Sequence, residues 1–230
     1  MFRLLVIGAI LPFCLSRIEQ PSDVSKVKLD VYMESFCPDT YRFIYDQLVP
    51  TFASLKQIID LTVIPYGKAE TTKVTYPFPD YSFRCQHGAK ECFGNELMSC
   101  SINRLKTAQK YLPVVQCLMM KQNNFNTCFN GTGLDYLDML NCGEGPEGRR
   151  LLAENGNKTH ALSPPATFIP WIVIDGEADS RAFTQLRSEI CSKYQGEKPP
   201  ACASNCTYRS SWKMEAFITY VLSLFPILQD

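Results

Sequence analysis

The chain has 230 residues, 46% of them hydrophobic, and its 23 Lys and Arg residues equal its 23 Asp and Glu residues in number. This length allows one domain with a hydrophobic core, or a core domain that contains an insertion. Because the net charge is zero and the sequence has no basic run, we do not expect nucleic acid as a partner.

The N-terminal segment, residues 1–16, has the features of a secretory signal peptide. Arg3 provides the positive charge, the stretch "LLVIGAILPFCL" is apolar, and Ser16 is a small residue before the expected cleavage point. The apolar stretch is too short to span a bilayer. The segment therefore predicts export of the chain.

Ten of the 11 cysteines remain once Cys14 is removed with the signal peptide. An exported chain folds in an oxidising compartment, so this number favours disulfides. Zinc is the competing interpretation, because "CQHGAKEC" contains Cys and His close together, but Cys-x2-Cys pairs are absent and the chain has only 2 histidines. We therefore expect no metal and no cofactor. The disulfide candidates are Cys85, Cys92, Cys100, Cys117, Cys128, Cys142, Cys191 and Cys202.

Three Asn-x-Thr sequons lie in the exported part of the chain, at Asn130, Asn157 and Asn205. Such sequons are acceptors for N-glycosylation in the secretory pathway. Together with the signal peptide and the cysteines, they predict a secreted or lysosomal glycoprotein.

The first structural unit predicted after the signal peptide is a strand, a helix and a second strand. Residues 26–36 alternate apolar and polar side chains, residues 40–58 have apolar side chains at helical spacing with a kink expected at Pro50, and residues 60–67 are rich in β-formers. Strands joined by a helix of this length form a parallel pair with a right-handed crossover.

Residues 85–142 differ in character, because they contain six of the ten cysteines and several short helical patterns. They predict a helical insertion held together by disulfides. Residues 143–165 are rich in Gly, Asn and Pro and are expected to form mainly a loop, with at most a short helix around "RRLLAEN".

The last predicted core unit begins at Pro170, which precedes a strongly β-forming run. Asp175-Gly176 is a hairpin signal, and residues 182–194 form an amphipathic helical pattern. This order of elements predicts an α/β fold with a thioredoxin-like core over residues 17–210 and the helical insertion at about 85–142.

The C-terminal tail, residues 211–230, contains the apolar run "AFITYVLSLFPIL", which is too short to span a membrane. We expect it to form a helix packed on the domain, with no stable membrane anchor. A removable signal for a lipid anchor is the alternative.

Cys37 is the predicted nucleophile, because it stands where the first strand ends and the first helix begins. The unpaired N–H groups of a helix N-terminus favour a thiolate over a thiol. Pro38 suits the first helical turn. Asp39 opposes the thiolate by placing a negative charge beside it, and Thr40 occupies the place where a second cysteine would resolve a mixed disulfide. The Thr40 hydroxyl is expected to donate a hydrogen bond to the Cys37 sulfur.

The alternative for Cys37 is a fifth disulfide, because ten is an even number. If Cys37 is free, a second cysteine must also be unpaired, and Cys206 is the candidate. Cys206 would then resolve Cys37 or link two chains into a disulfide-bonded dimer.

Pro170 is the second predicted site residue. In a thioredoxin-type fold, the proline before the third core strand faces the reactive cysteine in the cis form and presents backbone to an extended substrate. A trans proline that simply begins a strand is the alternative, since trans is commoner for X-Pro bonds in general.

The segment "CQHGAKECFGNELMSC", residues 85–100, resembles the signature of the gamma-interferon-inducible lysosomal thiol reductase family. "TVIPYGKA", "FIPWIVIDG" and "CSKYQGEKPPAC" extend the resemblance over about residues 27–202. The signature positions are Cys85, Gln86, His87, Gly88, Glu91, Cys92, Asn95 and Cys100. We interpret His87 and the other signature residues as structural.

The resemblance implies a soluble thiol reductase that reduces protein disulfides, usually at acidic pH, through a Cys-x-x-Cys pair. Cys37 matches the first cysteine of that pair, but Thr40 replaces the second, which leaves turnover in question. The leading hypothesis is a monothiol reductase in the secretory or lysosomal pathway, with disulfide-bonded proteins as substrates and an external small thiol as reductant. The alternatives are an inactive secreted binding protein and, with less support, a peroxidase or redox sensor that forms a sulfenic acid at Cys37.

Overall fold

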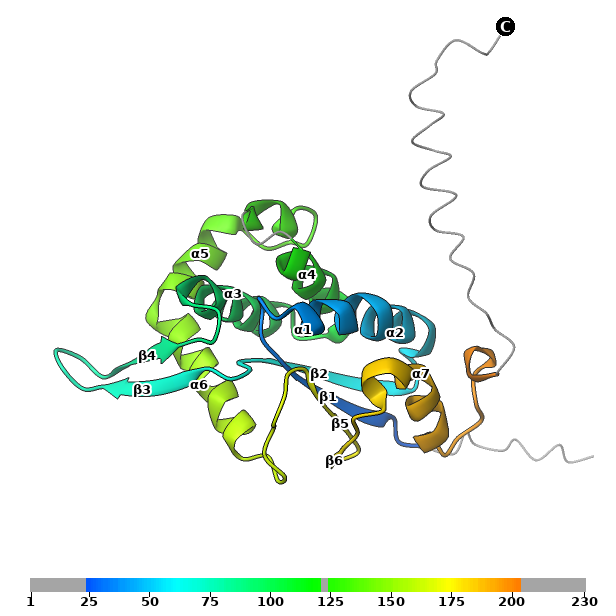
Figure 1. Cartoon of the computed structure of the whole chain (residues 1–230). Coiled ribbons are helices and arrows are strands. Elements are labelled where there is room, and N and C mark those ends of the chain that lie inside the picture. The colour runs from blue at the N-terminus through cyan, green and yellow to red at the C-terminus, as the bar shows by residue number, and fades with distance from the viewer. Residues whose placement is uncertain (1–23, 121–123, 204–230) are drawn as a thin grey trace, which may run out of the picture.

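A computed structural model describes residues 24–120 and 124–203 of the chain (Figure 1). The predicted signal peptide, the apolar tail, Asn205 and Cys206 all lie outside the described residues. In the described part, no helix is both long enough and apolar enough to cross a membrane.

A four-stranded sheet in the order β2-β1-β5-β6 forms the centre of the fold. Strands β1 (Val27–Met33) and β2 (Ile59–Pro65) are parallel, as the strand–helix–strand pattern predicted. Strands β5 (Trp171–Ile174) and β6 (Glu177–Ala178) continue the sheet in antiparallel order. The hairpin turn between β5 and β6 is also confirmed, because Asp175 and Gly176 have φ values of 51° and 86°, the combination that a tight two-residue turn requires.

The two faces of the sheet bury different amounts of apolar surface. The alternating residues Val27, Leu29, Val31 and Met33 all belong to the main core, which the helices cover. On the other face Tyr32 packs in a small separate cluster with Ile64 and Val173. The fold therefore concentrates its hydrophobic stabilisation on one side of β1 and holds that strand in a fixed register.

The helix after β1 is continuous but not regular. It consists of α1 (Pro38–Phe43), a π-helical turn η1 (Ile44–Leu48) and α2 (Val49–Leu55). Pro50 explains the irregular turn, because proline has no N–H to donate and its ring collides with the carbonyl one turn back. The wider π turn ends just before Pro50 and removes that conflict. Helix α7 (Ala182–Lys193) packs beside this helix, with Phe183 stacked on Phe43 at a centroid distance of 6.1 Å.

The region between the two halves of the sheet is helical, as predicted. It contains α3 (Ala89–Leu105), α4 (Ala108–Met120), the 3-10 turn η2 (Phe125–Phe129) and α5 (Tyr136–Glu144). All eight disulfide candidates are paired. Three bridges hold this helical region and its entrance together, and the fourth joins α7 to the 3-10 turn η3 (Pro200–Cys202). The pairs are Cys85–Cys92, Cys100–Cys142, Cys117–Cys128 and Cys191–Cys202.

The prediction that residues 143–165 form mainly a loop is wrong, because α6 spans Pro146–His160. Its glycines allow close packing rather than turns. A Cβ atom at Gly156 would lie 2.6 Å from the Tyr66 ring, and one at Gly148 would lie 3.0 Å from the backbone of Gly143. Asn155 is also part of the packing, since its side chain donates hydrogen bonds to the Pro65 carbonyl and the Ser99 hydroxyl.

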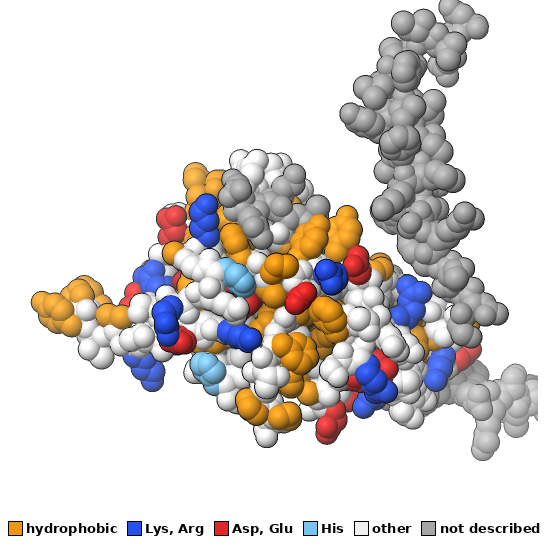
Figure 2. Space-filling model, in the orientation of Figure 1, with side chains coloured by type: hydrophobic (Ala, Val, Ile, Leu, Met, Phe, Trp, Pro, Cys, Tyr) orange, Lys and Arg blue, Asp and Glu red, His pale blue; other side chains and the backbone are white. Residues whose placement is uncertain are grey.

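A hairpin of β3 (Glu70–Val74) and β4 (Asp80–Arg84) was not predicted. It projects from the body of the protein in Figure 1, and its tip is the apolar group at the left edge of Figure 2. At this tip Tyr76 is 87% exposed and Phe78 is 78% exposed. Arg149 of α6 binds Asp80 at 2.7 Å and ties the tip end of β4 to α6.

Candidate active site

Cys37 occupies the N-cap position of α1. Its backbone is extended, with φ −73° and ψ 122°, and its sulfur accepts a hydrogen bond from the backbone N–H of Thr40 at 3.5 Å. Among the described residues Cys37 is the cysteine without a disulfide, and the residue is buried, with an exposed fraction of 8%. The junction of β1 and α1 therefore places a free sulfur at the start of a helix, where N–H groups stabilise its thiolate form.

The loop before β5 approaches the same sulfur from the other half of the fold. The Ile169–Pro170 peptide bond is cis, as expected, and the carbonyl oxygen of Ile169 lies 3.6 Å from the Cys37 sulfur. A protonated Cys37 donates to this carbonyl, whereas a thiolate receives the Thr40 N–H. The site thus brings Cys37 and the backbone before Pro170 together.

Thr40 does not make the side-chain contact expected from the sequence. Its side chain is fully buried, and its hydroxyl oxygen has no hydrogen-bond partner in the described part of the chain. The group that bonds to Cys37 is the backbone N–H of Thr40. The expectation failed because the Thr40 side chain points into the core, where its hydroxyl has no partner among the described residues. Such a group costs stability.

A surface groove of about 600 Å³ runs from Cys37 along the first two turns of the helix. Two exposed tyrosines, Tyr41 and Tyr45, stack with their ring centroids 5.8 Å apart and form one wall. The groove is lined by Phe36, Cys37, Pro38, Tyr41, Arg42, Tyr45 and Asp46. It combines apolar area with one cationic and one anionic side chain, which suits an extended peptide segment better than a strongly charged ligand.

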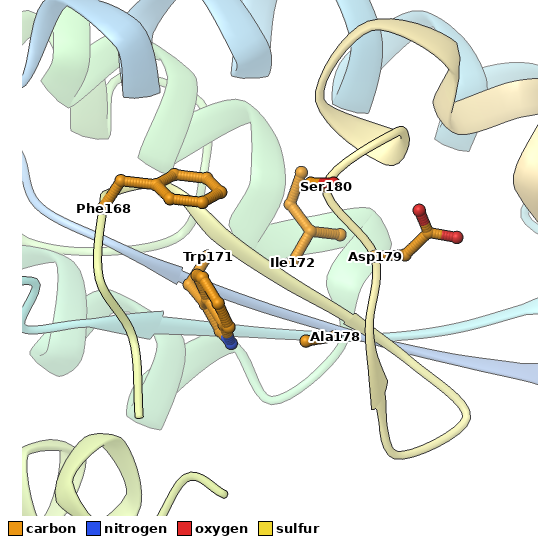
Figure 3. Close-up of a pocket in the computed structure, with 6 residues that line it drawn as sticks. All are labelled: Phe168, Trp171, Ile172, Ala178, Asp179 and Ser180. Carbon is orange, nitrogen blue, oxygen red and sulfur yellow. The ribbon is translucent and has the colours of Figure 1, made fainter. Parts of the chain in front are cut away.

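A smaller pocket lies between the start of β5 and the segment that follows β6 (Figure 3). The rings of Phe168 and Trp171 form an edge-to-face pair with a centroid distance of 5.0 Å. Its volume of about 10 Å³ is far below the range of about 300–1,000 Å³ typical of small-molecule sites. The lining residues are Phe168, Trp171, Ile172, Ala178, Asp179 and Ser180. We assign this pocket no ligand, and its aromatic pair shapes the loop that presents Ile169.

Residues of the signature hold the segment that leads into Cys37. Asn95 accepts a hydrogen bond from the backbone N–H of Ser35 at 2.8 Å, and the Ser35 hydroxyl donates to the carbonyl of Glu91 at 3.0 Å. Gly94 allows this approach, because a Cβ atom there would lie 2.5 Å from the Ser35 hydroxyl oxygen. The structural interpretation of these residues is thus consistent with their contacts, and the contacts lie two residues from the nucleophile.

Glu34 is a site residue that sequence reasoning missed. It is buried, and its carboxylate lies with His87 and Glu91 in a group whose ligand-type atoms all lie within 4.8 Å of one another. No sequence signal marks it, because its neighbours His87 and Glu91 belong to a distant segment of the chain.

Two predicted glycosylation sites lie in the described residues. Asn130 is exposed in the turn after η2, and Asn157 is exposed on α6. The sequon residue Thr159 is buried, and its hydroxyl donates to the carbonyl of Asn155. Their modification stays a prediction, as does that of Asn205.

Solved structures with low sequence identity share the fold. The MdbA protein, a thiol-disulfide oxidoreductase from Corynebacterium diphtheriae, is 13% identical with a TM-score of 0.51, covering 75% of this chain and 86% of its own. BdbD from Bacillus subtilis in its oxidised form is 12% identical with a TM-score of 0.53, covering 74% of this chain and 88% of its own. At these identities the likeness establishes the thioredoxin-like fold alone.

Sequence relatives are more specific. Residues 28–132 match the family described as Gamma interferon inducible lysosomal thiol reductase (GILT). A GILT-like protein of Caenorhabditis elegans is 42% identical over 76% of this chain, which spans about half, 55%, of that relative's length. The gamma-interferon-inducible lysosomal thiol reductases of Carassius auratus and Mus musculus are 34% and 30% identical, over 82% and 77% of this chain and 77% and 72% of their own lengths. Together with the thioredoxin-like fold, these matches show that the chain belongs to the gamma interferon inducible lysosomal thiol reductase family.

Proposed function

We propose that the protein is a monothiol thiol-disulfide oxidoreductase that reduces protein disulfides through Cys37. The observation that supports this most strongly is the free Cys37 sulfur at the N-cap of α1, facing the backbone before cis-Pro170. Membership of a thiol reductase family and an oxidoreductase fold support the same reaction class.

The reaction begins when the Cys37 thiolate attacks one sulfur of a substrate disulfide. A bond forms between the Cys37 sulfur and that sulfur, the substrate S–S bond breaks, and the leaving thiolate takes a proton from solvent. The backbone N–H of Thr40 stabilises the attacking thiolate before the step. The groove beside Tyr41 and Tyr45 holds the chain segments on either side of the substrate disulfide.

Release of the substrate requires an external thiol, because Thr40 provides no second sulfur in the helix. One small-thiol molecule attacks the mixed disulfide, and a second one reduces the mixed disulfide that results. Two thiols are thereby oxidised to one disulfide, which supplies the two electrons that the substrate receives. Cys206 is the protein thiol predicted to replace the small thiol or to link two chains, and it lies outside the described residues.

The proposed location is the secretory pathway or the lysosome. Four disulfides are typical of an oxidising compartment, and the relatives of Carassius auratus and Mus musculus are named as lysosomal proteins. The predicted signal peptide and sequons agree with this location.

The second candidate function is binding without turnover, which the buried Thr40 in place of a resolving cysteine favours. Purified wild-type protein and the Cys37→Ser variant, each mixed with insulin at pH 4.5 and 7 with and without a small thiol, distinguish the two. We expect insulin reduction by the wild type only when the thiol is present, and a background rate with Cys37→Ser. Equal rates for both proteins at both pH values would contradict the reductase and leave the binding function.

A further inference from the structure

The group of Glu34, His87 and Glu91 brings two buried carboxylates to one imidazole nitrogen. Glu34 follows the end of β1, and its Oε2 atom accepts a hydrogen bond from the backbone N–H of Lys68 at 2.9 Å. Glu91 Oε1 accepts a hydrogen bond from the backbone N–H of His87 at 3.1 Å. The remaining oxygens, Glu34 Oε1 and Glu91 Oε2, face His87 Nδ1. This nitrogen contacts Glu91 Oε2 directly and lies 3.7 Å from Glu34 Oε1.

Burial makes this arrangement costly when both carboxylates are ionised. The Glu34 side chain is 2% exposed and that of Glu91 is 0% exposed. Like charges this close in a low-dielectric site cannot both be ionised without compensation. The charged groups that face Glu34 are Glu91, His87 and Lys68. Burial raises the pKa of Glu34 and Glu91 raises it further, although the Lys68 N–H and the charges of His87 and Lys68 act in the opposite direction.

The group is joined to the nucleophile by the next residues of the chain. Ser35 is bonded through its N–H to Asn95 and through its hydroxyl to the carbonyl of Glu91, both on α3. Gly67 packs directly on Glu34, since a Cβ atom there would lie 2.1 Å from the carboxylate. Any separation of Glu34 from Glu91 therefore strains the Ser35 contacts, and Cys37 is two residues further on.

We infer that Glu34, buried against the Glu91–His87 pair, forms with that pair an acid-dependent clamp that positions the segment leading into Cys37. As regulation of the active site, this inference rests on the proposed function. Glu34, Glu91 and His87 are positioning residues and do not touch the substrate.

The sign of the pH dependence follows from the raised pKa of Glu34. A carboxyl group that holds its proton more tightly in the folded state contributes stability at acidic pH, and this contribution is lost as the pH rises through its folded-state pKa. The clamp is therefore closed at acidic pH and loosens as the pH rises and the Glu34 carboxyl loses its proton beside Glu91.

Hydrogen exchange of the Ser35 amide tests the clamp without any substrate. After correction for intrinsic exchange rates, we expect its protection factor in the full-length wild type to fall as the pH is raised from 4 to 7.5, because the Glu34 pKa is raised. In Glu34→Gln the amide mimics the protonated carboxyl, so protection is expected to stay constant. Glu96→Gln is the matched control, because it also neutralises a buried carboxyl of α3 but lies outside the clamp.

Constant protection in the wild type, or an equal fall in Glu34→Gln, would overturn the clamp. A fall that Glu96→Gln alone abolishes would overturn it as well. Excess Zn²⁺ at pH 7.5 is a further arm: protection restored by zinc in the wild type but not in Glu34→Gln would show a cation site instead of a clamp that protonation of Glu34 closes. The insulin assay run in parallel separates the two proposals, since pH-dependent protection without turnover contradicts only the reductase, and turnover with constant protection contradicts only the clamp.

Discussion

The two helix starts on either side of the segment 34–37 differ in how they treat charge. At the start of α1, the hydrogen-bond partners of the Cys37 sulfur within the described residues are backbone groups, the N–H of Thr40 and the carbonyl of Ile169. At the start of α3, titratable side chains contact one another in a buried group. The reactive sulfur and the pH-sensitive side chains thus lie in neighbouring but separate groups of residues. Substitutions can therefore change the reactivity of Cys37 and the pH dependence of its position independently.

The largest expected effect is a change of mechanism at the start of α1. Thr40→Cys places a thiol in a buried position next to Cys37, where it can attack the mixed disulfide within the same chain. We expect insulin to be released from the variant in a single turnover without added thiol, whereas the wild type remains as the mixed disulfide. Intact mass under both conditions measures this. Thr40→Ser is the control, and release from it as well would contradict the role assigned to position 40.

A second prediction concerns the pH dependence of folding stability, to which Glu96 contributes independently of the clamp. Burial raises the pKa of Glu96 to about 7, with Arg149 opposing and Asp80 adding to the shift. By the sign rule for raised carboxyl groups, stability is lost as the pH rises from about 4.5 to about 7, by at most about 3 kcal/mol.

Urea unfolding of the wild type and of Glu96→Gln at pH 5 and 7.5 measures this contribution. The loss between the two pH values is expected to shrink in the variant, while the Ser35 protection described above remains pH-dependent. An equal loss of stability in Glu96→Gln and the wild type would show that Glu96 does not contribute to the pH dependence of stability.

A third prediction tests the packing that places α6 behind the sheet. Gly156→Ala adds a Cβ atom that would lie 2.6 Å from the buried Tyr66 ring, so the helix or the ring must shift. Overpacking of this kind costs about 1–3 kcal/mol, which the midpoint of urea unfolding reports. Gly133→Ala, at a position with open space, is not a clean control because of its φ of 81°, so Ala153→Gly on the same helix is the comparison.

The smallest expected effect is at Thr40 itself. Thr40→Val removes a buried hydroxyl that has no partner in the described residues, and stability is expected to rise by about 1 kcal/mol. The midpoint of thermal unfolding measures the change. A decrease in stability would show that the hydroxyl has a partner in solution.

The sequence was sufficient where function depends on neighbours in the chain. Cys37 at the strand–helix junction, Pro50 at the irregular turn and the Asp175-Gly176 hairpin follow from local patterns, because each depends on adjacent residues. The order of elements was enough to predict the thioredoxin-like core and to place Pro170 before β5.

What the sequence could not show depends on contacts between distant segments. Helix α6 was missed because Gly148 and Gly156 are usually turn residues, and only the packed neighbours reveal why they are glycines. The hairpin of β3 and β4 was missed because few of its side chains are buried. Glu34 gave no signal because it meets His87 and Glu91 only in the folded chain.

The central claim is that Cys37 acts as a lone nucleophile, and peptide mapping of the trapped intermediate tests it most directly. The purified protein is incubated with a disulfide-bonded substrate, quenched in acid and digested without reduction. We predict one substrate adduct, on Cys37, with the four disulfides intact and with loss of the adduct when a small thiol is added before quenching. An adduct on another cysteine, or Cys37 recovered unmodified at both acidic and neutral pH, would contradict the claim.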